Sequence, residues 1–197
     1  MPYINQNRGD VRCGAYATAY WVWENAGGHP HINAEEYEED VHNIYRDVRF
    51  NRNDMHIIRN SRYAFMADEV RGFSNPFKIS DYLNNAIHAN TKVVSANADL
   101  RHKLEVLSNG PLDNQHIIND LANGERAILI MGTNVGGQTN PRHYVYAVGN
   151  NEIQLLNNRI GMTIIDPAYG ERLDVGYNLS AWADSFHGMQ FLDTVIR

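Results

Sequence analysis

The chain has 197 residues, a formal net charge of −6 and a single cysteine. The acidic balance argues against non-specific nucleic-acid binding and against binding to an anionic membrane surface, because both depend on clustered lysine and arginine. One cysteine excludes an internal disulfide framework and a cysteine-based zinc site. No apolar run approaches the ~18 residues that a transmembrane helix requires, so we expect no membrane span. Length and an ordinary composition predict one domain over residues 1–197.

Helices are predicted for most of residues 1–125. In the first, residues 13–26, Cys13, Ala17 and Trp21 fall on one helical face. Asp10 lies where an acceptor would cap this helix, and the glycine pair at residues 27–28 predicts its end. Further helices are expected at 34–44, from 80 onward, at 100–107 and at 112–121, with a short strand at 92–95.

The pattern changes to strands in residues 126–197. Apolar or alternating runs predict strands at 127–131, 143–148, 152–156, 162–165 and 188–195, separated by Asn-rich turns. Residues 133–142 (TNVGGQTNPR) are predicted to form a polar loop immediately before His143, and such loops often carry function. Helices followed by an antiparallel sheet indicate an α+β fold.

Cys13 must carry any thiol chemistry. A cysteine in the first turn of a helix lies at the positive end of the helix dipole, among free backbone N–H groups, and both favour the thiolate. Gly14 removes a side chain next to the sulfur, which we expect to leave room for a substrate. The alternative is that Cys13 is a small buried hydrophobic residue, the common role of a lone cysteine.

A thiol nucleophile needs a base, and His143 is the candidate because of the polar loop before it. Asp166 ends an apolar strand before Pro167, where its carboxylate can accept from the second imidazole nitrogen and fix the tautomer. The alternatives are a strand-end histidine without function and an ordinary turn aspartate, since Asp-Pro commonly opens turns.

An amide side chain upstream of the nucleophile can donate a hydrogen bond to a developing oxyanion, together with the backbone N–H of Cys13. Gln6 is the candidate for this role, and Asn5 and Asn7 compete with it.

Other sites are weaker. A proline separates His29 from His31 and prevents a shared face, and the helical pair His116 and Asp120 lacks a third ligand. No metal and no cofactor is therefore predicted. His187 is a weaker candidate for the base than His143, because no polar loop precedes it and it follows Asp166 in the chain.

The order of these motifs resembles the papain-like cysteine peptidase superfamily: Gln…Cys-Gly at a helix start, a helical middle, His-Tyr-Val…Val-Gly and Ile-Asp-Pro. Within it, the chain is most similar to bacterial peptidases of the bacteriocin-processing (double-glycine leader) type and to stand-alone relatives. The resemblance covers nearly the whole chain. It implies a papain-like fold, with a mainly helical part (residues 1–125) packed on a mainly antiparallel sheet part (residues 126–197).

The resemblance also implies the roles of the site residues. Cys13 would be the nucleophile, His143 the general base and acid, Asp166 the orienting residue and Gln6 the oxyanion donor. Gln6 stands one residue further from Cys13 than the family spacing, and Asn7 stands at that spacing.

The activity implied is hydrolysis of a peptide bond through an acyl-enzyme, with a protein or peptide as substrate and no nucleic-acid partner. Two alternatives remain: a glutamine deamidase or transglutaminase that uses the same triad, and a papain-like binding domain without turnover. The N-terminus shows no classical signal peptide, and lysine is limited to Lys78, Lys92 and Lys103. Both features suit a bacterial effector or toxin delivered into another cell, and the alternative is a housekeeping peptidase of the cytosol. We therefore expect a cytoplasmic location or secretion by a non-classical route.

Overall fold

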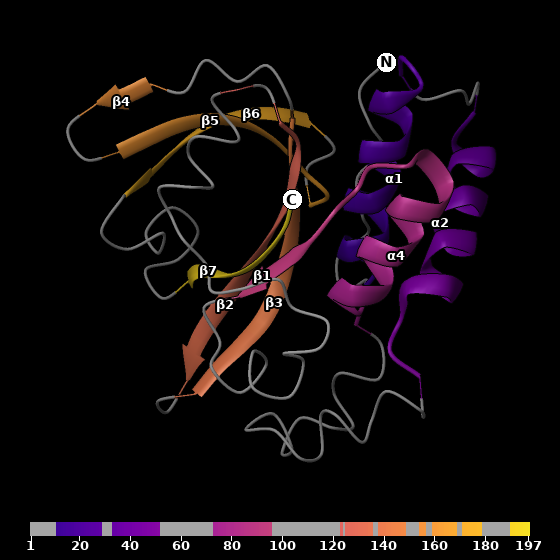
Figure 1. Cartoon of the computed structure of the whole chain (residues 1–197), viewed down its shortest axis with the longest axis horizontal. Helices are drawn as coiled ribbons and strands as arrows, with labels where there is room; N and C mark the ends of the chain where they lie inside the picture. The colour runs from indigo at the N-terminus through magenta and orange to yellow at the C-terminus, as the bar shows by residue number, and fades with distance from the viewer. Residues whose placement is uncertain are drawn as a thin grey trace.

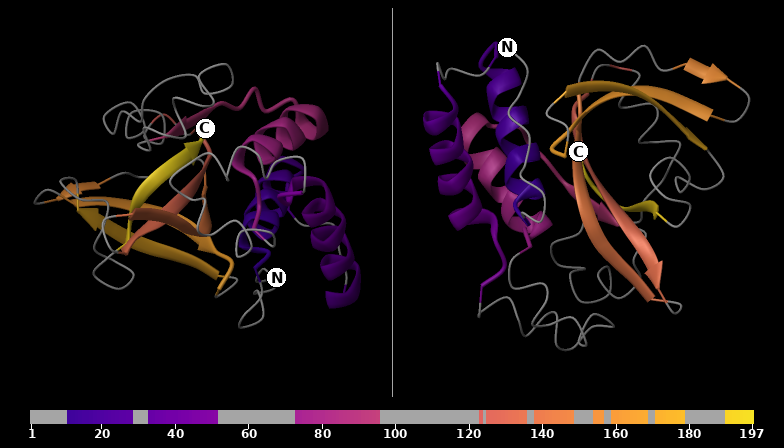
Figure 2. Two further views of the ribbon diagram at one scale, coloured as in Figure 1. Left: turned by 90° about the horizontal axis from the view of Figure 1, so that it is seen from below. Right: turned by 180° about the vertical axis from the view of Figure 1, so that it is seen from behind.

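The computed structural model describes residues 11–28, 33–51, 73–95, 123, 125–135, 138–148, 154–156, 159–168, 171–178 and 190–197. The described helices lie on one side of a curved sheet (Figures 1 and 2). They are α1 (Cys13–Asn25), α2 (Ala34–Val48) and α4 (Pro76–Ile87). The strands are β1 (Val93–Ser95), β2 (Ala127–Val135), β3 (Gln138–Ala147), β4 (Gln154–Leu156), β5 (Arg159–Asp166), β6 (Glu171–Asn178) and β7 (Gln190–Ile196). The predicted α+β class is confirmed.

The strands form one sheet in the order β1-β7-β2-β3-β5-β4, and β6 pairs with β5. Each pairing among the described strands is antiparallel. The last strand, β7, lies between β1 and β2, so the C-terminal segment forms an interior strand of the sheet. Between β3 and β5, Tyr146 pairs with Ile165 and Ala147 with Ile164. This register brings the beginning of the His-Tyr-Val motif close to the end of β5.

Helix α1 is the centre of the helical layer. It contacts α2 and α4 on one side and β3 and β5 on the other. Every residue from 13 to 21 is buried, so the helix is apolar on nearly all sides and not along the single predicted face. Aromatic side chains fill both interfaces: the rings of Trp21 and Tyr146 lie 6.0 Å apart, and those of Trp23 and Tyr37 4.3 Å. Burial of these rings favours the packing of α1 on the sheet and on α2.

The predicted end of α1 is confirmed. Gly27 and Gly28 have φ of +89° and +129°, which side chains rarely tolerate. Their N–H groups donate to the carbonyls of Glu24 (3.2 Å) and Trp23 (2.7 Å), the two bonds of a Schellman cap. Two glycines in sequence therefore end this helix for a geometric reason.

The other two helices begin at asparagine caps. Asn33 accepts from the N–H of Glu36 (2.9 Å) at the start of α2, which runs four residues further than the predicted 34–44. Asn75 accepts from the N–H of Phe77 (2.9 Å) at the start of α4, and Pro76 takes the first helical position. Helix α4 thus begins four residues before the predicted start at residue 80. The Asn-Pro pair was a readable start signal.

The predicted loop at residues 133–142 is wrong. Strands β2 and β3 continue through most of it as a hairpin whose last pair is Val135 with Gln138. Only residues 136 and 137, both glycine, stand between the strands, which is the composition that two-residue hairpins prefer. Proline in this segment favours a loop, whereas Pro141 lies within β3 beside a β-bulge. His143 consequently lies within β3 and not at the start of a strand.

The remaining strand predictions are confirmed within a few residues, as β1, β4, β5 and β7, whereas β6 was not predicted. The helices expected at 100–107 and 112–121 lie outside the described residues, and so does Asp10. Within the described ranges, no helix has the length and apolar character that crossing a membrane requires.

The α4 cap gives a first test. Asn75→Ala removes the acceptor for the N–H of Phe77, so we expect the free energy of unfolding to fall by about 1 kcal/mol, measured by urea denaturation. The matched control is Asn85→Ala, at an exposed position in the same helix, where better helix propensity should raise stability by about 0.5 kcal/mol. Equal effects of the two substitutions would contradict the capping role.

Candidate active site

Cys13 is the first residue of α1 and is 3% exposed. Arg12 takes the N-cap position, and no described side chain caps the helix there. No side chain in the described part of the chain therefore competes for the N–H groups of the first turn, which are of the kind that stabilises negative charge. The burial of Cys13 fits the alternative that it is a small buried hydrophobic residue. Its position at the N-terminus of the helix is also the one that suits a nucleophile.

His143 approaches this helix end from β3. On β2, Met131 pairs with His143 but Gly132 pairs with Pro141, so Arg142 is the extra residue of a β-bulge directly before the histidine. A bulge bends the strand and changes the direction of neighbouring side chains, and bulges are frequent beside active sites. Pro141 is tolerated here because a bulge interrupts the hydrogen-bond ladder. The imidazole is 20% exposed, which leaves one edge accessible.

Asp166, the last residue of β5, holds the imidazole. Its Oδ1 lies 2.8 Å from Nε2 of His143 and also accepts from the N–H of Ala168 at 2.8 Å. The second contact is the turn role that the sequence suggested as the alternative, so Asp166 fills both roles with one oxygen. The carboxylate is 1% exposed, and its Oδ2 has no hydrogen-bond partner among the described residues.

The structure brings Cys13, His143 and Asp166 together. Burial alone would lower the pKa of His143, but hydrogen bonds to the side chains of Asp166 and Cys13, with their negative charge, outweigh it and raise the pKa from 6.5 to about 10. Because Nε2 binds Asp166, Nδ1 is the nitrogen left to face Cys13. The imidazole is thus held facing Cys13, with a pKa that keeps it protonated at neutral pH.

The expected substrate space beside Gly14 is absent. A Cβ at Gly14 would lie 2.4 Å from Cβ and 2.5 Å from Oγ of Ser74, and 3.3 Å from Cδ1 of Ile79. Glycine is therefore required at this position by close packing against the segment that leads into α4. Sequence reasoning did not identify Ser74.

A charged cluster supports the start of α1. Arg12 forms an ion pair with Glu38 of α2 (Nη2 to Oε2, 3.1 Å), and its guanidinium lies over the ring of Tyr16, 5.6 Å from the centroid. The hydroxyl of Tyr16 donates to the same carboxylate. A cation at the N-terminus of a helix opposes the dipole, so the carboxylate of Glu38 offsets an unfavourable charge next to Cys13.

Several candidates lie outside the described residues: Gln6, Asn5, Asn7, His29, His31, His116, Asp120 and His187. In the portion of the chain that the structure describes, no three histidine, cysteine or acidic side chains are grouped as metal ligands.

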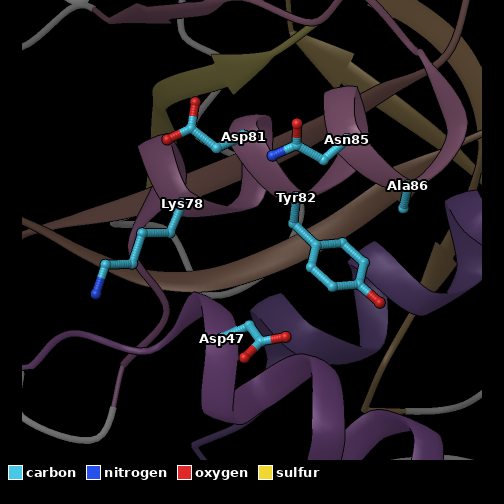
Figure 3. Close-up of a pocket in the computed structure, with 6 residues that line it drawn as sticks. All are labelled: Asp47, Lys78, Asp81, Tyr82, Asn85 and Ala86. Atoms are coloured by element: carbon cyan, nitrogen blue, oxygen red, sulfur yellow. The ribbon is translucent and has the colours of Figure 1, made fainter.

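A hollow of about 480 Å³ lies between α2 and α4 (Figure 3). It is lined by Asp47, Lys78, Asp81, Tyr82, Asn85 and Ala86. Burial, and then the charges of Asp47 and Asp40, raise the pKa of the Tyr82 hydroxyl. None of the lining residues belongs to α1 or to the sheet, so this hollow is separate from the Cys13–His143–Asp166 cluster.

Comparison with known protein families, with curated proteins and with solved structures found no significant match.

The protonation state of His143 can be measured directly. We expect its imidazole, followed by NMR and assigned with His143→Gln, to titrate near pH 10. Asp166→Asn removes the carboxylate that raises this pKa, so the midpoint should move downward. A midpoint near 6.5 in both proteins would contradict the arrangement.

The same shift predicts how stability depends on pH. The folded protein binds this proton more tightly than the unfolded chain, in which histidine titrates near 6.5. The stabilisation is therefore complete below pH 6.5 and is lost as the pH rises through about 10. Urea denaturation from pH 6.5 to 10 should show a steeper fall in the free energy of unfolding for the wild type than for His143→Gln, and equal slopes would contradict the linkage.

Proposed function

We propose that this chain is a thiol hydrolase that cleaves a peptide bond, with Cys13 as nucleophile, His143 as acid and base, and Asp166 as the residue that orients His143. One observation carries the proposal: a single imidazole connects the thiol at a helix N-terminus to a buried carboxylate, with Nε2 2.8 Å from Asp166. The Cys-His-Asp combination is a known solution for acyl transfer on unrelated folds.

In the first half of the proposed reaction, the thiolate of Cys13 attacks the carbonyl carbon and forms an S–C bond. The N–H groups of the first turn of α1 stabilise the resulting oxyanion. The imidazolium of His143 then gives its proton to the amide nitrogen, the C–N bond breaks, and the amine leaves. The products are an acyl-enzyme and a neutral imidazole.

In the second half, neutral His143 takes a proton from water as the oxygen attacks the thioester carbon. The tetrahedral intermediate collapses, the C–S bond breaks, and the carboxylic acid leaves. Thiolate and imidazolium are restored, so protons balance over the cycle. Asp166 accepts from Nε2–H throughout and keeps Nδ1 directed at the reacting atoms.

A papain-like arrangement is part of the proposal. Support comes from a nucleophile at the start of a central helix, with the base and the carboxylate on two neighbouring antiparallel strands packed against that helix. In such an arrangement, Gln6, or its neighbours Asn5 and Asn7, would supply the second oxyanion donor beside the backbone N–H of Cys13.

Alkylation of Cys13 by iodoacetamide tests the pair without a substrate. An ordinary thiol reacts more than about 100-fold more slowly at pH 6 than at pH 9, because so little of it is thiolate. We expect a fall of less than about 10-fold in the wild type and the ordinary steep fall in His143→Ala. The rate at pH 6 divided by the rate at pH 9 corrects for any change in accessibility of the thiol. If this ratio is as low in the wild type as in His143→Ala, Cys13 is a structural residue.

The reaction type is tested with a proteome-derived peptide library. We expect wild-type enzyme, under reducing conditions, to generate new amino termini that Cys13→Ala does not generate, read by mass spectrometry. Release of ammonia with intact peptides would instead identify a glutamine deamidase. No change in any peptide, together with an ordinary alkylation profile, would favour a binding domain.

A further inference from the structure

Ser74 lies where three parts of the fold meet: the start of α1, the segment leading into α4, and strand β3. It is buried and forms an isolated bridge with Arg49, just after α2. Sequence reasoning gave it no role. Each of its two neighbours directly follows a residue of the candidate site in the chain: Gly14 follows Cys13, and Tyr144 follows His143.

On the helix side, Ser74 contacts the backbone of α1. A Cβ at Gly14 would come within 2.4 Å of the Cβ of Ser74, a separation that real Cβ atoms do not adopt. Helix and segment are thus in contact with no space between them, at the residue next to the nucleophile. Close packing of this kind transmits displacement, because dense interiors are hard to compress.

On the sheet side, the hydroxyl of Tyr144 donates to the carbonyl of Ser74 at 2.6 Å, and the bond is buried. A tyrosine side chain has few rotatable bonds, so this hydrogen bond fixes the position of β3 relative to Ser74. His143 directly precedes Tyr144 in the same strand, so this bond also fixes the position of His143.

Ser74 is itself held in place. The N–H of Phe50 donates to the carbonyl of Phe73 (2.9 Å), and the N–H of Asn75 donates to the carbonyl of Val48 (2.7 Å). These two bonds tie both neighbours of Ser74 to the end of α2 and to the residues directly after it. The Oγ of Ser74 has no hydrogen-bond partner among the described residues, so Ser74 acts through its Cβ and its carbonyl.

We propose that Ser74 and Tyr144 are positioning residues that set the separation of Cys13 and His143 across the interface between helix and sheet. Ser74 sets the position of Cys13 through packing on Gly14. The Tyr144 hydrogen bond to the Ser74 carbonyl sets the position of His143. This inference rests on the proposed function, since the separation matters only where the two side chains act as a pair.

The test uses the ratio of Cys13 alkylation rates at pH 6 and pH 9. Tyr144→Phe keeps the ring and removes the donor, and we expect it to lower this ratio by about 10-fold, toward that of His143→Ala. A merely structural effect would expose the buried thiol and raise both rates alike, which leaves the ratio unchanged. The matched control is Tyr146→Phe, which removes a buried hydroxyl two residues along the same strand and should leave the ratio at the wild-type value.

A second pair of variants tests the contact on the helix side. Gly14→Ala should lower the ratio, because its methyl group forces α1 and Ser74 apart. Ser74→Gly removes the opposing Cβ and keeps the carbonyl that Tyr144 binds. The double variant Gly14→Ala with Ser74→Gly should therefore recover the wild-type ratio, and it decides the question even where Tyr144→Phe does not fold.

The outcomes separate the two proposals. If the wild type has the same low ratio of alkylation rates as His143→Ala, the proposed function fails. If they differ while Tyr144→Phe matches wild type, or if Gly14→Ala is not rescued by Ser74→Gly, the positioning role fails and the proposed function stands. A lowered ratio in Tyr144→Phe, a normal ratio in Tyr146→Phe and recovery in the double variant together support the positioning role.

Discussion

The hydrogen bond between His143 and Asp166 is the constraint on which the rest of the site depends. The carboxylate is 1% exposed, and a buried carboxylate is strongly unfavourable unless it is paired and hydrogen-bonded. Its Oδ1 meets this requirement twice, through the imidazole and through the N–H of Ala168. The register of β3 on β5 brings these groups together. The pairing of the two strands therefore determines both the burial of Asp166 and the orientation of His143.

Helix α1 brings the thiol to that imidazole at a cost that the fold offsets locally. Because its first nine residues are buried, α1 cannot shift to suit the site without repacking the aromatic core around it. Its N-terminal end carries Arg12, which opposes the dipole, and Glu38 of α2 compensates this charge. The outer helix α2 therefore contributes to the electrostatics at the start of α1, next to Cys13.

How far the sequence predicts this structure depends on the range of the signal. Local signals succeeded at Gly27 and Gly28, and an Asn-Pro start to α4 was present but not used. The composition of residues 133–142 favours a loop, but proline is also compatible with a strand that carries a bulge, as at Pro141. The contact of Ser74 with Gly14 joins residues 60 apart in the chain, and the bond from Tyr144 to Ser74 joins residues 70 apart. No local pattern encodes either contact. The sequence alone therefore favours substrate space beside Gly14, where the structure has close packing on Ser74.

The raised pKa of His143 also bears on the proposed reaction, because the two partners that raise it differ in their fate. Asp166 is unchanged through the cycle, whereas the negative charge of Cys13 disappears when the sulfur becomes a thioester. Burial, which lowers the pKa, remains. Acylation therefore removes one of the influences that keep the imidazole protonated, and its pKa falls at the step where a neutral base is needed to activate water. An acid for the first half-reaction and a base for the second can thus come from one side chain, with the covalent state of Cys13 as the switch between them.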